Sequence, residues 1–101
     1  MNRENATGIW VFAETRGGEL ESTVSELLAA SRKLAKVTGE KVTAVLLEGL
    51  DLDLASVLIE YGADVVLEVR NDILRDFDPV LYKDALAQLV DKYNPNIFLF
   101  G

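Results

Sequence analysis

A short loop after the first apolar run holds the residues best suited to contact an anion. Residues 14–19 begin and end with glutamate and contain Thr15, Arg16, Gly17 and Gly18. Dinucleotide-binding folds hold a phosphate at this position, and Thr15 and Arg16 would be the donors here. However, no G-x-G-x-x-G or P-loop pattern is present, and the flanking glutamates repel phosphate. The alternative is an ordinary turn in which Gly17 or Gly18 takes a positive φ.

Three acidic residues follow the second apolar run. Glu48, Asp51 and Asp53 carry the carboxylates that hard cations prefer as ligands. Residues of this kind more often cap a helix or keep a loop solvated. We favour the second interpretation and predict no metal site.

The side chains of most nucleophilic and metal-dependent enzymes are missing. The chain has no cysteine and no histidine, which excludes thiol nucleophiles, iron–sulfur ligation and the usual zinc sites. Ser22, Ser25, Ser31 and Ser56 lie in no G-x-S-x-G setting. The sequence therefore predicts no catalytic residues.

The length and the net charge of the chain further limit the class of protein it can be. The 101 residues predict one domain over residues 1–101, and half of them are hydrophobic. The net charge of −7 disfavours both nucleic acid and an anionic membrane surface as partners. The apolar runs are far shorter than the roughly 20 residues of a membrane-spanning helix, and the polar start shows no signal region. We expect a cytoplasmic protein.

Four apolar runs of strand length recur along the chain. They are rich in β-branched and aromatic residues, and none alternates cleanly between apolar and polar. Such strands belong in a parallel sheet covered on both faces. The runs are residues 9–13, 42–47, 65–69 and 97–100.

Three helical patterns lie between these runs. The first extends from Thr23 to Val37, with a capping box of Thr23 and Glu26 and a stop at Gly39. The second is a shorter helix through Leu58, capped by Asp51 or Asp53 and ended by Tyr61-Gly62. The third begins at Asp78-Pro79, ends before Asn94-Pro95, and turns one apolar stripe inward. The stripe consists of Tyr82, Ala85, Leu86, Leu89, Val90 and Tyr93.

The alternation of strands and helices predicts an α/β fold with an open parallel sheet of four strands, Rossmann-like or flavodoxin-like. Strand orders 3-2-1-4 and 2-1-3-4 both fit. In either order, right-handed crossovers place two helices on one face and one on the other. One helix covers about two strands, so we expect one apolar face to be partly bare.

Two further expectations concern particular residues. Trp10 lies in the middle of the first strand, and we expect it in the core, with a subunit contact as the alternative. Phe98-Leu99-Phe100-Gly101 predicts a strand leading directly into its exit loop. Together with the bare face, this indicates an incomplete domain that is part of a larger assembly.

The residues on these strands resemble the start of the alpha subunit of electron transfer flavoproteins. The resemblance rests on residues 8–14 with Leu20 and Ser25-Glu26-Leu27-Leu28, on Tyr61-Gly62-Ala63-Asp64-Val65-Val66, on the stretch from Leu74 to Tyr82, and on Tyr93-Asn94-Pro95 leading to Phe98 and Gly101. It covers essentially the whole chain in order, although no single motif is very specific. It implies the adenine nucleotide alpha hydrolase-like variety of the Rossmann-like fold.

The resemblance also implies a function. Alpha subunits of this family continue well beyond this length, and a later domain binds FAD, so none of the family's FAD ligands is carried over to this chain. The partner is a beta subunit, and the heterodimer takes electrons from dehydrogenases such as those acting on acyl-CoA. This segment would be scaffold and subunit interface, with no cofactor of its own. A small stand-alone nucleotide-binding domain using the loop at residues 14–18 is the alternative, and a general protein-interaction module is a third.

Overall fold

A computed structural model describes residues 5–48, 53–74 and 76–101. Four parallel strands form one sheet in the order β5-β4-β1-β6. Counted along the chain, this is the order 3-2-1-4, one of the two predicted. The strands are β1 (Ile9–Phe12), β4 (Val42–Glu48), β5 (Val65–Arg70) and β6 (Ile97–Leu99). All four lie where the apolar runs predicted them, with ends shifted by one residue at most.

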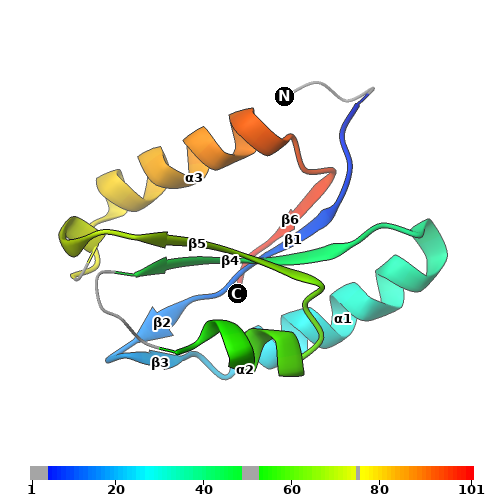
Figure 1. Ribbon diagram of the computed structural model, residues 1–101, viewed down its shortest axis with the longest axis horizontal. Helices are drawn as coiled ribbons and strands as arrows, with labels where there is room; N and C mark the ends of the chain where they lie inside the picture. Colours follow the sequence, from blue (N-terminus) through cyan, green and yellow to red (C-terminus); the bar gives the residue numbers. More distant parts are fainter. Residues whose placement is uncertain (1–4, 49–52, 75) are drawn as a thin grey trace.

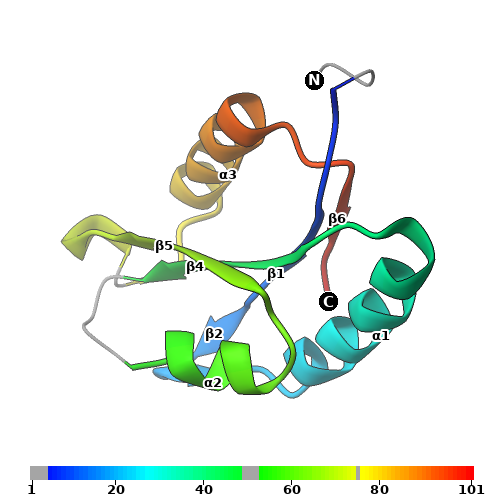
Figure 2. The same cartoon turned by 45° about the vertical axis from the view of Figure 1, so that its right-hand side comes forward.

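Three α-helices connect the strands and cover the sheet unequally. α1 (Thr23–Thr38) and α2 (Ala55–Glu60) lie on one face, and α3 (Pro79–Tyr93) lies alone on the other (Figures 1 and 2). A short 3₁₀ turn, η1 (Asp72–Leu74), precedes α3. The predicted division of two helices against one is therefore confirmed.

The face under α1 and α2 holds the deeper core. Alternate strand residues point into it because side chains along a strand alternate between faces. They meet Val24, Leu28 and Ala35 from α1 and Leu58 from α2, all buried. The strand residues are Ile9, Val11, Ala13, Val42, Ala44 and Leu46.

The face under α3 is packed less deeply. Trp10, Val45, Leu47 and Leu74 are buried there, whereas no residue of α3 is buried: most of its predicted apolar stripe is partly buried, and Val80 and Tyr93 are exposed. Trp10 is 4% exposed, which confirms its place in the core. In Figure 1, α3 crosses the sheet obliquely, from the ends of β4 and β5 to the starts of β1 and β6. The partly bare face that the sequence predicted is this one.

The ends of the helices differ from the sequence predictions in two places. α1 begins after Ser22, which makes no side-chain cap hydrogen bond, so the predicted capping box of Thr23 and Glu26 is wrong. α2 begins after Leu54 rather than at Asp53, although its end at Glu60, directly before Tyr61-Gly62, is as predicted. Asp51, the other proposed cap, lies outside the described residues.

The other predicted helix ends are confirmed. Gly39 ends α1 with a φ of 76°, a conformation that glycine adopts without strain. The Asp78 carboxylate accepts hydrogen bonds from the backbone N–H of Val80 and Leu81, and Pro79 occupies the first turn of α3. Asn94 ends that helix in the left-handed conformation.

Candidate functional site

The loop at residues 14–19 forms an antiparallel β-hairpin. Its strands are β2 (Thr15–Arg16) and β3 (Glu19–Leu20), and Gly17 and Gly18 join them with φ values of 60° and 82°. Two positive φ values in a two-residue turn are the geometry of a type I′ hairpin, which matches the twist of the flanking strands. The predicted alternative, a turn with a positive φ at Gly17 or Gly18, is therefore confirmed. The pairing of the flanking residues into a hairpin was not predicted, although two adjacent glycines between short strand segments are its usual signal.

A pocket of about 1020 Å³ lies between this hairpin and the start of α3. Phe12 at the end of β1, Leu47 near the end of β4 and Phe100 directly after β6 line it. From β1 the chain proceeds to β4 and β5 on one side, and it then returns to β6 on the other side of β1, so the strand order switches between β1 and β6. Open parallel sheets bind ligands at that point, outside the carboxyl ends of the strands. Thr15, Arg16, Gly17 and Gly18 all line the pocket, so the structure brings the four sequence candidates together.

Aromatic rings dominate the apolar wall of this pocket. Phe77 meets Tyr82 at 5.1 Å between ring centroids, Tyr82 meets Phe12 at 6.5 Å, and Phe12 meets Phe100 at 5.7 Å. The contacts continue beyond the pocket, under α3, from Phe98 to Trp10 and Tyr93. Phe77 and Phe100 remain 66% and 53% exposed, which leaves an aromatic surface open at the carboxyl end of the sheet.

Polar contacts around the pocket engage Arg16, Tyr82 and the start of α3. The Arg16 guanidinium forms an ion pair with Glu21 at 3.0 Å and is otherwise exposed. The Asp78 carboxylate occupies the N–H groups at the start of α3. The Tyr82 hydroxyl donates to the Leu74 carbonyl, and burial raises the pKa of this phenol, with a further contribution from Asp76. The pocket lining therefore combines aromatic faces with three carboxylates, of Glu14, Glu48 and Asp76, and two cationic side chains, of Arg16 and Lys83.

The acidic residues after β4 do not form a metal centre in the part of the chain that is described. Glu48 is buried and lies beside Arg70, with its Oε1 3.7 Å from the arginine Nε. Arg70 also pairs with Glu68. Asp51 lies outside the described residues, and among the residues that are described no group of three acidic, histidine or cysteine side chains could hold a metal ion.

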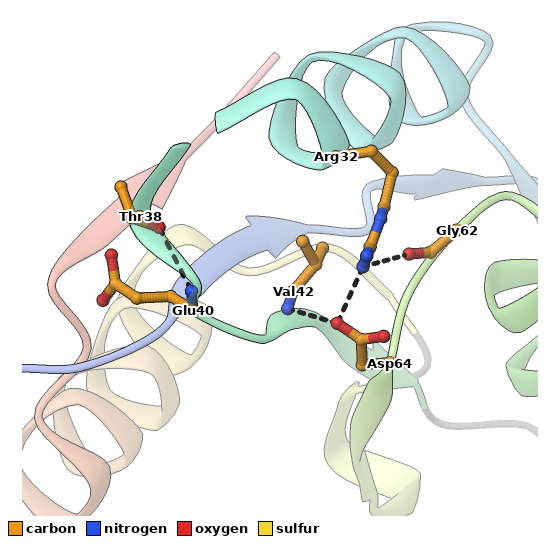
Figure 3. A network of polar contacts seen from close by, with 6 residues as sticks. All are labelled: Arg32, Thr38, Glu40, Val42, Gly62 and Asp64. Atoms are coloured by element: carbon orange, nitrogen blue, oxygen red, sulfur yellow. Dashed lines mark hydrogen bonds and ion pairs between the residues drawn. The ribbon is translucent and has the colours of Figure 1, made fainter. Parts of the chain in front are cut away.

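At the opposite, amino end of the sheet, two carboxylates form hydrogen bonds that join neighbouring segments of the chain. Asp64 Oδ2 accepts hydrogen bonds from the Val42 backbone N–H at 2.8 Å and from Arg32 Nη1 at 2.7 Å, and Arg32 also donates to the Gly62 carbonyl (Figure 3). These contacts join α1, the start of β4 and the turn before β5. The Val42 N–H and the Arg32 guanidinium lower the pKa of the Asp64 carboxyl.

Glu40 forms the second of these carboxylate contacts. Its backbone N–H donates to the Thr38 hydroxyl (Figure 3), while its side chain accepts from the Gly8 N–H at 2.6 Å and from Asn96 Nδ2 at 3.3 Å. The Gly8 N–H is the main reason that the pKa of Glu40 is lowered. Glu40 thereby ties the starts of β1 and β6 to the turn after α1. Both carboxylates serve the fold rather than a ligand.

Fold and site together define an open Rossmann-like α/β domain with a pocket at the strand-order switch. Comparison with known proteins gives the family: the model of the electron transfer flavoprotein domain matches residues 9–101. The chain belongs to this family. In the described residues, no helix is both long enough and apolar enough to span a bilayer.

Several relatives carry the name of the family's alpha subunit. The electron transfer flavoprotein subunit alpha of Clostridium acetobutylicum is 37% identical over 101 residues, which is 100% of this chain and 30% of that protein. The subunit alpha of Thermoanaerobacterium thermosaccharolyticum is 39% identical over 93 residues, 92% of this chain and 28% of that protein. Protein FixB of Clostridium saccharobutylicum is 38% identical over 101 residues, which is 100% of this chain and 30% of that protein. The chain thus spans less than a third of these relatives.

Proposed function

We propose that this chain acts as the N-terminal segment of an electron transfer flavoprotein alpha subunit, as scaffold and subunit interface rather than as redox centre. The observation that carries the proposal is the match to alpha subunits, which covers 92–100% of this chain and 28–30% of theirs. The parent protein would be a heterodimer with a beta subunit. It would carry FAD and take electrons from dehydrogenases such as those acting on acyl-CoA.

The pocket chemistry supports placing the flavin outside this segment. FAD carries a pyrophosphate, which folds of this kind hold with backbone N–H groups at a helix start. Here the Asp78 side chain occupies the N–H groups of Val80 and Leu81. Glu14, Glu48 and Asp76 place three carboxylates on the pocket wall, against the two cationic side chains of Arg16 and Lys83. A helix start already occupied by its own aspartate, with more carboxylates than cations beside it, is a poor match for a pyrophosphate.

The test is to purify the protein through an affinity tag from cells that also express the beta subunit of the same source. We expect the beta subunit to co-purify with material that contains the complete alpha subunit. That material should show the visible absorbance of an oxidised flavin. The 101 residues alone should show no flavin absorbance. Flavin bound tightly by these residues alone would contradict the proposal.

One observation favours a second function, a small nucleotide-binding domain. The pocket lies at the strand-order switch and includes Thr15, Arg16, Gly17 and Gly18, the residues that such a domain would use. Calorimetric titration with AMP, ATP and FAD separates the two proposals. Micromolar binding of a nucleotide, lost in Arg16→Ala, would establish the second function. Absence of heat at millimolar nucleotide would remove it.

A further inference from the structure

Charge is distributed unequally between the two ends of the sheet. The structure describes fifteen acidic and eight basic residues. Each helix runs antiparallel to the strands that it connects. The starts of the helices therefore lie beside the ends of the strands, at the carboxyl end of the sheet. The ends of the helices lie beside the starts of the strands, at the amino end. Eleven of the fifteen acidic residues but only three of the eight basic ones, Arg16, Arg70 and Lys83, fall at the carboxyl end. The amino end holds the remainder: Glu40, Glu60, Asp64, Asp91, Arg32, Lys33, Lys36, Lys41 and Lys92.

Two of the three basic residues at the carboxyl end are paired with carboxylates, and the third, Lys83, lies on the pocket wall. Arg16 pairs with Glu21, and Arg70 pairs with Glu68 beside Glu48. Among the described residues, eleven acidic and three basic side chains give the carboxyl end a net charge of −8, whereas four acidic and five basic ones give the amino end +1. A field of this kind attracts cationic groups and raises their rate of encounter with the surface.

The same end carries the aromatic pocket. Phe77 and Phe100 are exposed at its rim, and Phe12 and Tyr82 form its inner wall. An apolar pocket with charged residues around it is the arrangement that anchors one large side chain of a partner, with polar contacts at its edge. We call the pocket and the carboxylates of Glu14 and Asp76 on its wall the acidic aromatic surface.

We propose that the acidic aromatic surface docks a basic segment of another protein chain, whose apolar or aromatic side chain enters the pocket between Phe12, Tyr82 and Phe100. Lysine or arginine residues on either side of that anchor meet the carboxylates around the pocket. A nucleotide is disfavoured because its phosphates would face those carboxylates. A second copy of this chain is disfavoured because two such ends repel each other.

This inference goes beyond the proposed function and does not depend on it. It names an end of the domain and the chemistry of its partner, and neither follows from membership of the family. A synthetic peptide serves as the probe, so that neither a flavin nor a beta subunit is needed. Failure of the peptide to bind would leave the flavin and co-purification experiments unaffected.

The probe is a pentapeptide with a central phenylalanine between pairs of lysines, with blocked ends, titrated into the protein by calorimetry. Two further peptides replace phenylalanine with alanine, or all lysines with glutamates. We expect binding of the first peptide, several-fold weaker binding of the second, and none of the third. Affinity for the first should fall steeply between roughly 0.05 and 0.5 M salt, because the contacts are between exposed charges.

Two matched pairs of substitutions locate the site. Glu14→Gln with Asp76→Asn should weaken binding about fivefold, whereas Glu60→Gln with Asp91→Asn removes the same charge at the amino end and should change affinity by less than about 1.5-fold. Phe100→Ala should weaken binding roughly fivefold or more. Circular dichroism shows whether each variant is folded.

The proposal is overturned if the glutamate peptide binds as well as the lysine peptide, or if both double variants weaken binding equally. Salt-independent binding to the unmodified protein would also overturn it, and that measurement needs no variant to fold. Binding of AMP at this pocket, in competition with the peptide, would replace the proposal with a nucleotide site.

Discussion

The two faces of the sheet differ in how completely their helices cover them. On the first face, α1 buries Val24, Leu28, Ser31 and Ala35. On the second face, α3 is almost as long but buries no residue to that degree. Aromatic rings fill much of the second face, and pockets remain beside α3 at both ends of the sheet. The first face stabilises the domain, and the second leaves surface for contact with other molecules.

Because α1 is buried more completely than α3, the same leucine-to-alanine substitution should lower the free energy of unfolding more on α1 than on α3. Leu28→Ala removes a fully buried side chain and should lower the free energy of unfolding by about 3 kcal/mol or more. Leu86→Ala on α3 removes a partly buried one and should cost about 1 kcal/mol. Urea unfolding followed by circular dichroism measures both. Equal losses would show that the faces are packed alike and would remove the basis of the comparison.

A glycine beneath α1 tests the close packing of the first face by a different route. Gly62 has a φ of 120°, and an added Cβ would lie 3.1 Å from Arg32 Cγ. Gly62→Ala should therefore cost about 2 kcal/mol, through backbone strain and displacement of the arginine.

Gly39→Ala is the control for this substitution, because Gly39 also has a positive φ but no atom within 4 Å of the added Cβ. We expect it to cost only about 1 kcal/mol. A Gly62→Ala protein as stable as Gly39→Ala would show that contact with Arg32 contributes nothing. Thermal unfolding resolves the difference.

The carboxylate of Asp64 makes the stability of this region depend on pH. Its pKa is lowered in the folded protein, so the carboxylate stabilises the fold above its unfolded pKa, near 4, and that contribution is lost as the pH falls through the folded value. Asp64→Asn should lower the free energy of unfolding at pH 7 by about 1 kcal/mol. The loss is small because the Asp64 side chain is partly exposed to solvent, which screens its charge. The variant should lose less stability than the parent between roughly pH 5 and pH 2.

Glu40 provides the comparison at the same end of the sheet. Its pKa is also lowered, so Glu40→Gln should flatten the acid limb of the stability curve as well. Asp91→Asn, which changes an exposed carboxylate on α3, should leave the curve unchanged. Curves of identical shape for all three variants would show that the two carboxylate contacts do not contribute to acid stability.

The sequence predicted most of the fold because local signals and global packing agree there. The four apolar runs form the four strands of the sheet. As predicted, α1 ends at Gly39, and α3 begins at Asp78-Pro79 and ends at Asn94. The start of α1 was mispredicted because both Ser22 and Thr23 are good capping residues by type. The helix begins after Ser22 in a helical backbone conformation and uses neither side chain as a cap.

The sequence predicted where the candidate site lies, but not the hairpin and the aromatic wall that make it up. Thr15, Arg16, Gly17 and Gly18 do line a pocket, because the chain leaves a central strand there. Their arrangement as a hairpin depends on two strands of two residues each, too short for a periodic signal. The aromatic wall was also hidden, because Phe12, Tyr82 and Phe100 come together only through the strand order and the oblique path of α3.

The smallest expected effect concerns how the two long helices begin. α1 starts without a side-chain cap, whereas Asp78 caps α3 through two hydrogen bonds. A helix that buries a full face can form without a cap, because packing supplies most of its stability. A helix that is only partly buried depends more on local contacts. Ser22→Ala should therefore be neutral within a few tenths of a kcal/mol, and Asp78→Ala should cost slightly less than about 1 kcal/mol.

Asp78→Ser is the matched control for this last pair, because serine caps a helix about as well as aspartate. It should restore most of the stability lost in Asp78→Ala. Hydrogen exchange should place the loss in the first turn of α3, at Val80 and Leu81, whose N–H groups the aspartate accepts. A loss spread equally over α1 and α3 would mean that the two faces unfold as one unit. In that case, the looser packing of α3 would give it no local freedom to adapt to a partner.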